Sequence, residues 1–108
     1  MTEDNPHVID LDVDAATAKG FGDKEMDAGN YQQAVYHYLD ALDQSPDQEM
    51  YERIHYNLAN AYRHLGDAMN CSERAKVVCR SNNRSWQSYG LRLFYWANTG
   101  EDIPGLAG

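Results

Sequence analysis

Three glycines that end helical runs are the strongest constraint on how this 108-residue chain can fold. Gly29, Gly66 and Gly100 each follow an amphipathic stretch and precede a polar residue. Glycine is the usual residue at the left-handed position that stops a helix, so each one marks a helix end. The first two lie 37 residues apart and the last two lie 34 apart, which indicates a repeated helical unit.

The apolar pattern between these glycines predicts five helices and no strand. The clearest run follows Gly29, where apolar residues recur at the i, i+3, i+4, i+7 spacing of a one-faced helix: Tyr31, Ala34, Val35, Tyr38, Ala41 and Leu42. Ser45 and Gln48 have capping-box spacing, which predicts that Ser45 caps the third helix. The fourth helix is expected to stop at the polar run 81–83, and the fifth to span about 85–99.

Short connections make successive helices antiparallel neighbours, so the expected fold is all-α, a stack of antiparallel helix hairpins. This domain should cover residues 14–100. Residues 1–13 hold four acids and a proline with little helical periodicity, which is typical of a flexible acidic N-terminal segment. Residues 101–108 contain a proline and two glycines and are expected to form a flexible tail.

The repeated unit resembles the tetratricopeptide repeat (TPR) family in its period and its residue pattern. In the first unit, about residues 15–48, the matching residues are Phe21, Gly22, Ala34, Tyr38, Ala41 and Pro46. In the second, about residues 52–85, they are Leu58, Ala59, Tyr62, Cys71, Ala75 and Val78, with Asn83 in place of the usual proline. A third unit supplies only the helix at about 85–99, through Tyr89, Leu93 and Trp96. The resemblance implies a TPR-type α-solenoid of two repeats plus a C-terminal capping helix.

The resemblance also implies a concave groove, lined by the first helix of each hairpin, that binds a peptide of another protein. By helical phase, the groove residues are Lys19, Asp23, Met26, Arg53, Tyr56, Asn57, Asn60, Arg63, Gln87 and Phe94. Three of these residues are cations and one is a carboxylate, so the groove favours acidic peptides or a chain-end carboxylate. The expected function is that of a protein–protein interaction adaptor.

One TPR subclass, the cochaperones, holds the C-terminal carboxylates of Hsp70 and Hsp90 with two asparagines and three cations. Lys19 and Asn57 match this pattern, while Asp23 replaces the other asparagine and would repel a carboxylate. Gln87 and Leu91 stand where a lysine and an arginine are expected. Hsp70 or Hsp90 is the specific partner that the resemblance suggests. The alternative is that Lys19 and Asn57 are ordinary solvated groove residues.

The fifth predicted helix carries large apolar residues around much of its circumference, although a terminal capping helix should present a polar face to water. A partner, a second copy of this chain, residues 103–106 or further repeats would cover it, or the rings pack on the fourth helix. The alternative function is therefore a structural or assembly protein that forms a homo-oligomer through this helix. Its contact residues would be Trp86, Leu91, Phe94, Tyr95 and Trp96.

The formal net charge is −8 and is unevenly divided along the chain. Residues 1–52 hold 13 acids against two lysines, whereas residues 53–108 hold four acids against seven Lys or Arg. Solvated helix faces explain this division, with a head-to-tail self-contact as the alternative. The acidic balance argues against a nucleic-acid partner. No apolar run approaches the roughly 18 residues of a spanning helix and no signal peptide is visible, so a soluble, cytoplasmic protein without membrane insertion is expected.

No catalytic, metal or cofactor site is predicted. The four histidines lack the i, i+4 spacing of a helical metal pair, and no GxSxG, phosphate loop or Gly-rich dinucleotide turn occurs. Cys71 and Cys79 would lie roughly 12 Å apart on one helix, which is too far for a disulfide, and are interpreted as packing residues. The protein is therefore expected to bind no cofactor and not to be an enzyme.

Overall fold

The computed structural model describes residues 14–103, and this part of the chain is all-helical. Its helices are α1 (Ala15–Asp27), α2 (Tyr31–Leu42), α3 (Gln48–His64), α4 (Ala68–Cys79) and α5 (Arg84–Thr99), with no strand between residues 14 and 103. The prediction of an all-α fold is confirmed. The predicted N-terminal segment and residues 104–108 of the predicted tail lie outside the described residues.

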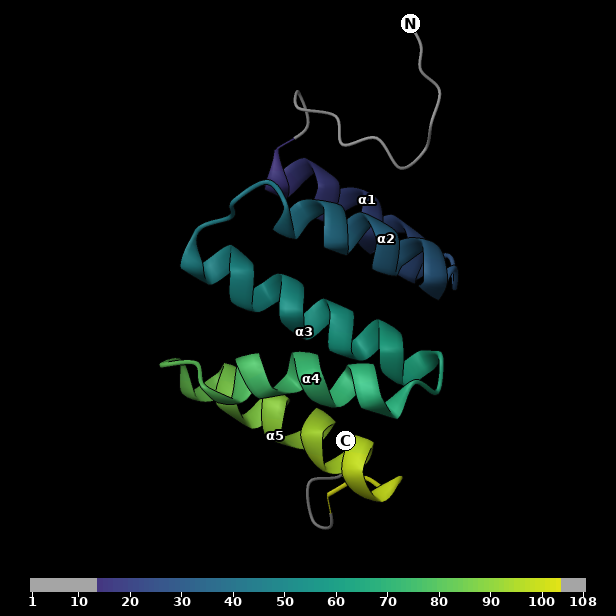
Figure 1. Cartoon of the computed structure of the whole chain (residues 1–108), viewed down its shortest axis with the longest axis vertical. Coiled ribbons are helices and arrows are strands. Elements are labelled where there is room, and N and C mark those ends of the chain that lie inside the picture. Colours follow the sequence, from purple (N-terminus) through teal and green to yellow (C-terminus); the bar gives the residue numbers. More distant parts are fainter. Residues whose placement is uncertain (1–13, 104–108) are drawn as a thin grey trace, which may run out of the picture.

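The helices are stacked in chain order along the longest dimension of the molecule (Figure 1). Each helix packs on the next one, and α3 also contacts both α1 and α5. Helix α3 is therefore the centre of the stack, with α1 and α2 at one end and α4 and α5 at the other. The contacts of α3 with α1 and α5 give these three helices a shared face.

Carboxylates cap the starts of three helices. Asp14, Asp47 and Asp67 each accept a hydrogen bond from the backbone N–H three residues further on, at 2.8, 2.9 and 3.1 Å. The predicted cap at Ser45 is wrong, because α3 begins at Gln48 and its N-cap is Asp47. Ser45 has a left-handed backbone (φ 53°) in the turn before the helix. A carboxylate at the N-cap, such as that of Asp47, also interacts favourably with the positive end of the helix dipole.

The three glycines end helices as predicted. Gly29, Gly66 and Gly100 have φ angles of 81°, 75° and 77°, a region that is strained for residues with a Cβ. The three additional residues between the first two glycines are distributed over three places. The α2–α3 connection covers residues 43–47 where the α4–α5 connection covers 80–83, α3 has 17 residues where α5 has 16, and Leu65 lies between α3 and Gly66.

Two glycines allow neighbouring helices to approach closely. A Cβ at Gly22 would lie 2.5 Å from the ring of Tyr38 on α2, and a Cβ at Gly90 would lie 2.6 Å from the backbone nitrogen of Cys79 on α4. The side chains around these approaches form a core that runs through the stack: Ala18, Ala34, Val35, Tyr38, Ala41, Ile54, Leu58, Ala59, Ala61, Tyr62, Cys71, Ala75 and Leu93.

Candidate functional site

The face shared by α1, α3 and α5, called here the groove face, brings together most of the residues predicted for the groove. An amide of Asn57 on α3 reaches Asp23 on α1, and the ring of Tyr56 on α3 contacts Trp86 on α5. The predicted residues on this face are Lys19, Asp23, Arg53, Tyr56, Asn57, Asn60 and Arg63. Met26, also predicted, packs against the core instead.

Asp23 is the centre of a polar cluster at the α1 side of the groove face. Its carboxylate pairs with the Lys19 ammonium at 2.8 Å and accepts hydrogen bonds from the Tyr38 hydroxyl at 2.7 Å and the Asn57 amide at 3.3 Å. Burial and, secondarily, the nearby carboxylate of Asp23 raise the pKa of Tyr38, so this phenol stays protonated and donates a hydrogen bond to Asp23. The two residues that match the cochaperone pattern, Lys19 and Asn57, are therefore both engaged by Asp23.

Aromatic rings cover the part of the groove face between α3 and α5. The rings of Tyr56, Trp86 and Tyr89 contact one another with centroid distances of 5.2 to 5.6 Å. The Arg53 guanidinium lies 5.9 Å from the centroid of the Trp86 ring, within cation–π range. Such a surface offers apolar contact area and a cation together, a combination that suits a peptide with both apolar and acidic side chains.

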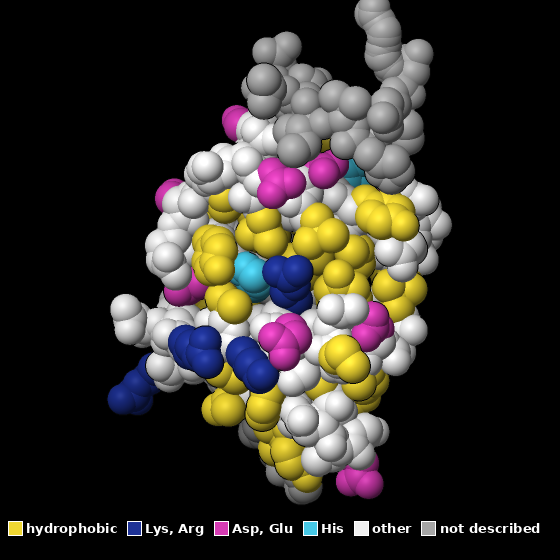
Figure 2. Space-filling model, in the orientation of Figure 1, with side chains coloured by type: hydrophobic (Ala, Val, Ile, Leu, Met, Phe, Trp, Pro, Cys, Tyr) yellow, Lys and Arg dark blue, Asp and Glu magenta, His cyan; other side chains and the backbone are white. Residues whose placement is uncertain are grey.

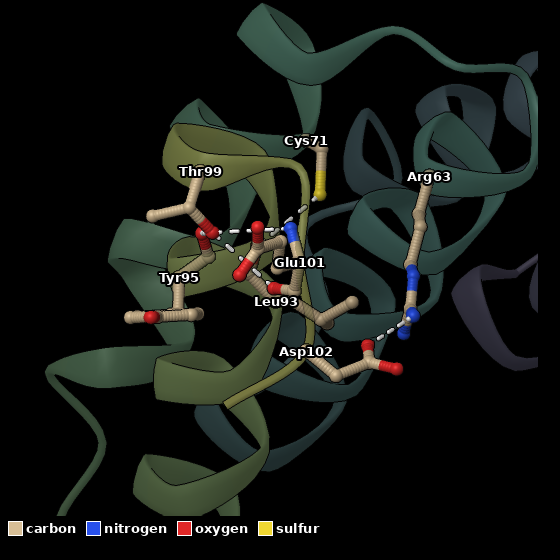
Figure 3. A network of polar contacts seen from close by, with 7 residues as sticks. All are labelled: Arg63, Cys71, Leu93, Tyr95, Thr99, Glu101 and Asp102. Carbon is tan, nitrogen blue, oxygen red and sulfur yellow. Dashed lines mark hydrogen bonds and ion pairs between the residues drawn. The ribbon is translucent and has the colours of Figure 1, made fainter. Parts of the chain in front are cut away.

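A second arginine lies near the other end of α3, where the chain that follows α5 comes back to the groove face (Figure 3). Arg63 pairs with Asp102 at 2.6 Å, and its guanidinium lies 5.5 Å from the centroid of the Trp96 ring. The Thr99 hydroxyl accepts a hydrogen bond from the Glu101 backbone N–H at 3.1 Å and so shapes the turn that leads to Asp102. An acidic residue outside any helix is thus held on a groove cation.

Beside Arg63 is a pocket of about 530 Å³ lined by Asn60, Arg63, His64 and Trp96. The His64 ring is stacked on Tyr31 with a centroid distance of 4.4 Å, which fixes one wall. This pocket combines an amide, a guanidinium, an imidazole and an indole. Those groups can donate hydrogen bonds to a carboxylate or a backbone carbonyl.

Besides Met26, two more residues predicted for the groove do not face it. The Gln87 amide donates a hydrogen bond to the Ser81 carbonyl at 2.6 Å, and Phe94 lies beside α4, in a pocket with Lys76 and Cys79. The close contact of Gly90 with the α4 backbone sets the rotation of α5 about its own axis. In this orientation Trp86 and Trp96 face α3 instead.

Because of this rotation of α5, the residues predicted for self-association lie on two different sides of the helix. Trp86 and Trp96 are on the groove face, while Leu91 and Phe94 lie on the α4 side of α5. Tyr95 is half-buried. The groove residues that were not predicted are Tyr31, His64, Trp86, Tyr89, Trp96 and Asp102. The stripe of Trp86, Tyr89, Leu93 and Trp96 at helical spacing is the sequence signal that indicated the true phase of α5.

The cysteines lie in apolar surroundings. Cys71 is buried and Cys79 is half-buried, and both are free thiols. Burial raises the pKa of Cys71 to about 11 and also raises that of Cys79, so neither is a reactive thiolate at neutral pH. Among residues 14–103, no three His, Cys, Asp or Glu side chains gather as a metal site. None of the five helices is both long and apolar enough to cross a bilayer.

Comparison of the chain with protein-family models, with curated proteins and with solved structures finds no match.

Proposed function

We propose that this chain is a TPR domain of two repeats, α1–α2 and α3–α4, with α5 as the capping helix, and that it acts as a cytoplasmic protein-binding adaptor rather than an enzyme. The support for the TPR assignment is the packing of helices in chain order and the close helix approach at Gly22. The left-handed glycines that end α3 and α5, Gly66 and Gly100, lie 34 residues apart, which is the period of the family, and Gly29 at the end of α1 lies 37 residues before Gly66.

The groove face is the proposed binding site, and an acidic peptide segment of another protein is its ligand. The ion pair of Arg63 with Asp102 carries this proposal, because there the groove face already holds an acidic residue of a non-helical chain segment. The Asp102 side chain is 76% exposed, so a partner's carboxylate can reach and replace it. Asp102 would then be an intramolecular competitor of the ligand.

A titration of the protein with a fluorescein-labelled acidic peptide, followed by anisotropy, tests this function. We expect Arg63→Gln to weaken binding about tenfold, because a charge-assisted hydrogen bond is lost. Asp102→Asn should tighten binding by about twofold to fivefold, because an exposed ion pair contributes up to about 1 kcal/mol and no longer competes. The opposite signs of the two effects identify Arg63 as the shared position.

Glu101→Gln is the matched control for Asp102→Asn. It removes the same charge one residue earlier, and among residues 14–103 its carboxylate makes no ion pair. Equal tightening by both variants would mean that only the net charge matters. The absence of any peptide binding would remove the groove face as the functional site.

The Hsp70 and Hsp90 tails are the specific version of this proposal, and they need Lys19 and Asn57 to be available. In the wild-type protein Asp23 holds both groups. We therefore expect weak binding of a peptide that ends in EEVD. Asp23→Asn should strengthen it about tenfold, since a carboxylate is removed and the neutral amide leaves both donors available.

The same peptide with an amidated C-terminus shows whether the chain-end carboxylate is the group recognised, and it should gain nothing from Asp23→Asn. The control variant is Asp27→Asn, which removes the charge of an exposed acid on the same helix. If Asp27→Asn strengthens binding as much, the effect is general electrostatics and the clamp version is wrong.

A further inference from the structure

A second surface lies between α4 and α5, on the side of α5 that does not face α3. A pocket of about 200 Å³ there is lined by Lys76 and Cys79 of α4, by Arg80 directly after this helix, and by Leu91 and Phe94 of α5. Leu91 is 54% exposed and Arg80 is exposed. The pocket therefore has apolar walls and a basic rim, which suits a chain segment that is both apolar and acidic.

The charges of the two ends of the stack are opposite. Residues 68–99, which form α4, α5 and their connection, hold five Lys or Arg and one Glu, a formal charge of +4. Residues 14–47, which form α1 and α2, hold seven acids and two lysines, a formal charge of −5. In Figure 2, which has the orientation of Figure 1, most of the visible Lys and Arg side chains lie over the half of the molecule that contains α4, with hydrophobic side chains directly beside them.

The sequence before α1 has the composition that this pocket needs. Residues 1–13 contain four acids and no Lys or Arg, and apolar and acidic residues alternate in Ile9, Asp10, Leu11, Asp12 and Val13. In an extended segment, alternate side chains point to opposite sides. In this conformation Ile9, Leu11 and Val13 would lie on one side of the segment and the carboxylates of Asp10 and Asp12 on the other.

We propose that the α4–α5 pocket binds residues 8–13 of a second copy of this chain, so that copies associate head to tail. Asp14, which continues this segment into the structure, caps α1, whereas the pocket is lined by α4 and α5. These helices are at opposite ends of the stack (Figure 1). Ile9 and Leu11 pack on Leu91 and Phe94, and the carboxylates approach Arg80. Such a contact is heterologous, so the mean mass rises continuously with concentration and does not stop at a dimer.

Sedimentation velocity of the full-length protein over a wide concentration range tests this inference. We expect reversible association that weakens as salt is added. Leu91→Asp and Arg80→Glu should each weaken it about tenfold, and so should the double variant Asp10→Lys with Asp12→Lys. An equimolar mixture of the Arg80→Glu protein with that double variant should associate again, since the reversed charges are complementary.

Two control variants make the same chemical changes elsewhere. Met69→Asp alters an apolar side chain that is 78% exposed, and Lys24→Glu reverses an exposed cation on α1; both should associate like the wild type. A monomer at every concentration overturns the inference. Association that survives Leu91→Asp, or that survives the Asp10 and Asp12 reversals, also overturns it. Leu91 lies on the α4 side of α5, away from the groove face. Leu91→Asp should therefore leave acidic-peptide binding unchanged.

Discussion

Gly90→Ala is expected to lower the free energy of unfolding by about 3 kcal/mol, the upper end of the range for overpacked contacts. The new Cβ would lie 2.6 Å from the Cys79 backbone nitrogen and 2.9 Å from the Val78 carbonyl carbon, and backbone atoms cannot move aside as the end of a side chain can. Helices α4 and α5 must separate along their contact. In a domain of this size the melting temperature should fall by about 10 to 15 °C.

Gly20→Ala is the matched control for this prediction. Gly20 is inside α1, and nothing lies within 4 Å of the position where its Cβ would be placed. Alanine should therefore stabilise the protein there by about 0.5 to 1 kcal/mol through helix propensity alone. Chemical denaturation followed by tryptophan fluorescence measures both variants, because Trp86 and Trp96 flank Gly90 on α5. Equal stability of Gly90→Ala and the wild type would contradict the close approach of α4 and α5.

Local signals in the sequence predict the helices well because they act within a few residues. The apolar stripe of α2 and the left-handed glycines at 29, 66 and 100 depend only on helix geometry and backbone sterics. The start of α3 was misplaced because Ser45 and Asp47 both offer a capping oxygen. The sequence pattern does not show which of these two side chains accepts a hydrogen bond from the free N–H groups at the start of the helix.

The candidate site could be predicted only in part, since its details depend on contacts between helices. Most of the α3 residues were placed correctly, as this helix is central and its buried side is plainly apolar. The groove residues predicted on α5 were wrong because the close packing of Gly90 on α4 sets the rotation of this helix, and the stripe that contains Trp86 and Trp96 was assigned to self-association instead of the groove. Asp23 was taken as an open, repelling carboxylate. Its Tyr38 and Asn57 partners come from other helices, and no local pattern predicts them.

The free energy of unfolding should fall as the pH decreases from about 6.5 to about 4, because of one buried histidine on α3. His55 is 4% exposed, its ring centroid is 4.4 Å from that of Tyr51, and neither of its nitrogens has a hydrogen-bond partner among residues 14–103. Burial and, to a smaller extent, the positive charge of Arg74 lower the pKa of His55 to about 4. The unfolded chain binds this proton at its ordinary pKa of about 6.5, so acid favours unfolding, by up to about 3 kcal/mol.

His55→Leu should remove most of this dependence and stabilise the protein at neutral pH by about 1 to 2 kcal/mol. Leucine is similar in size, and the two unpartnered nitrogens, each of which costs free energy when buried, are no longer present. Urea denaturation at a series of pH values measures both effects. His64→Leu is the control, since it replaces an exposed histidine in the last turn of the same helix and should leave the acid sensitivity in place. If the His55→Leu protein loses as much stability as the wild type over this interval, the proton is taken up by other groups, and the His55 imidazole is not the acid-sensitive element of the fold.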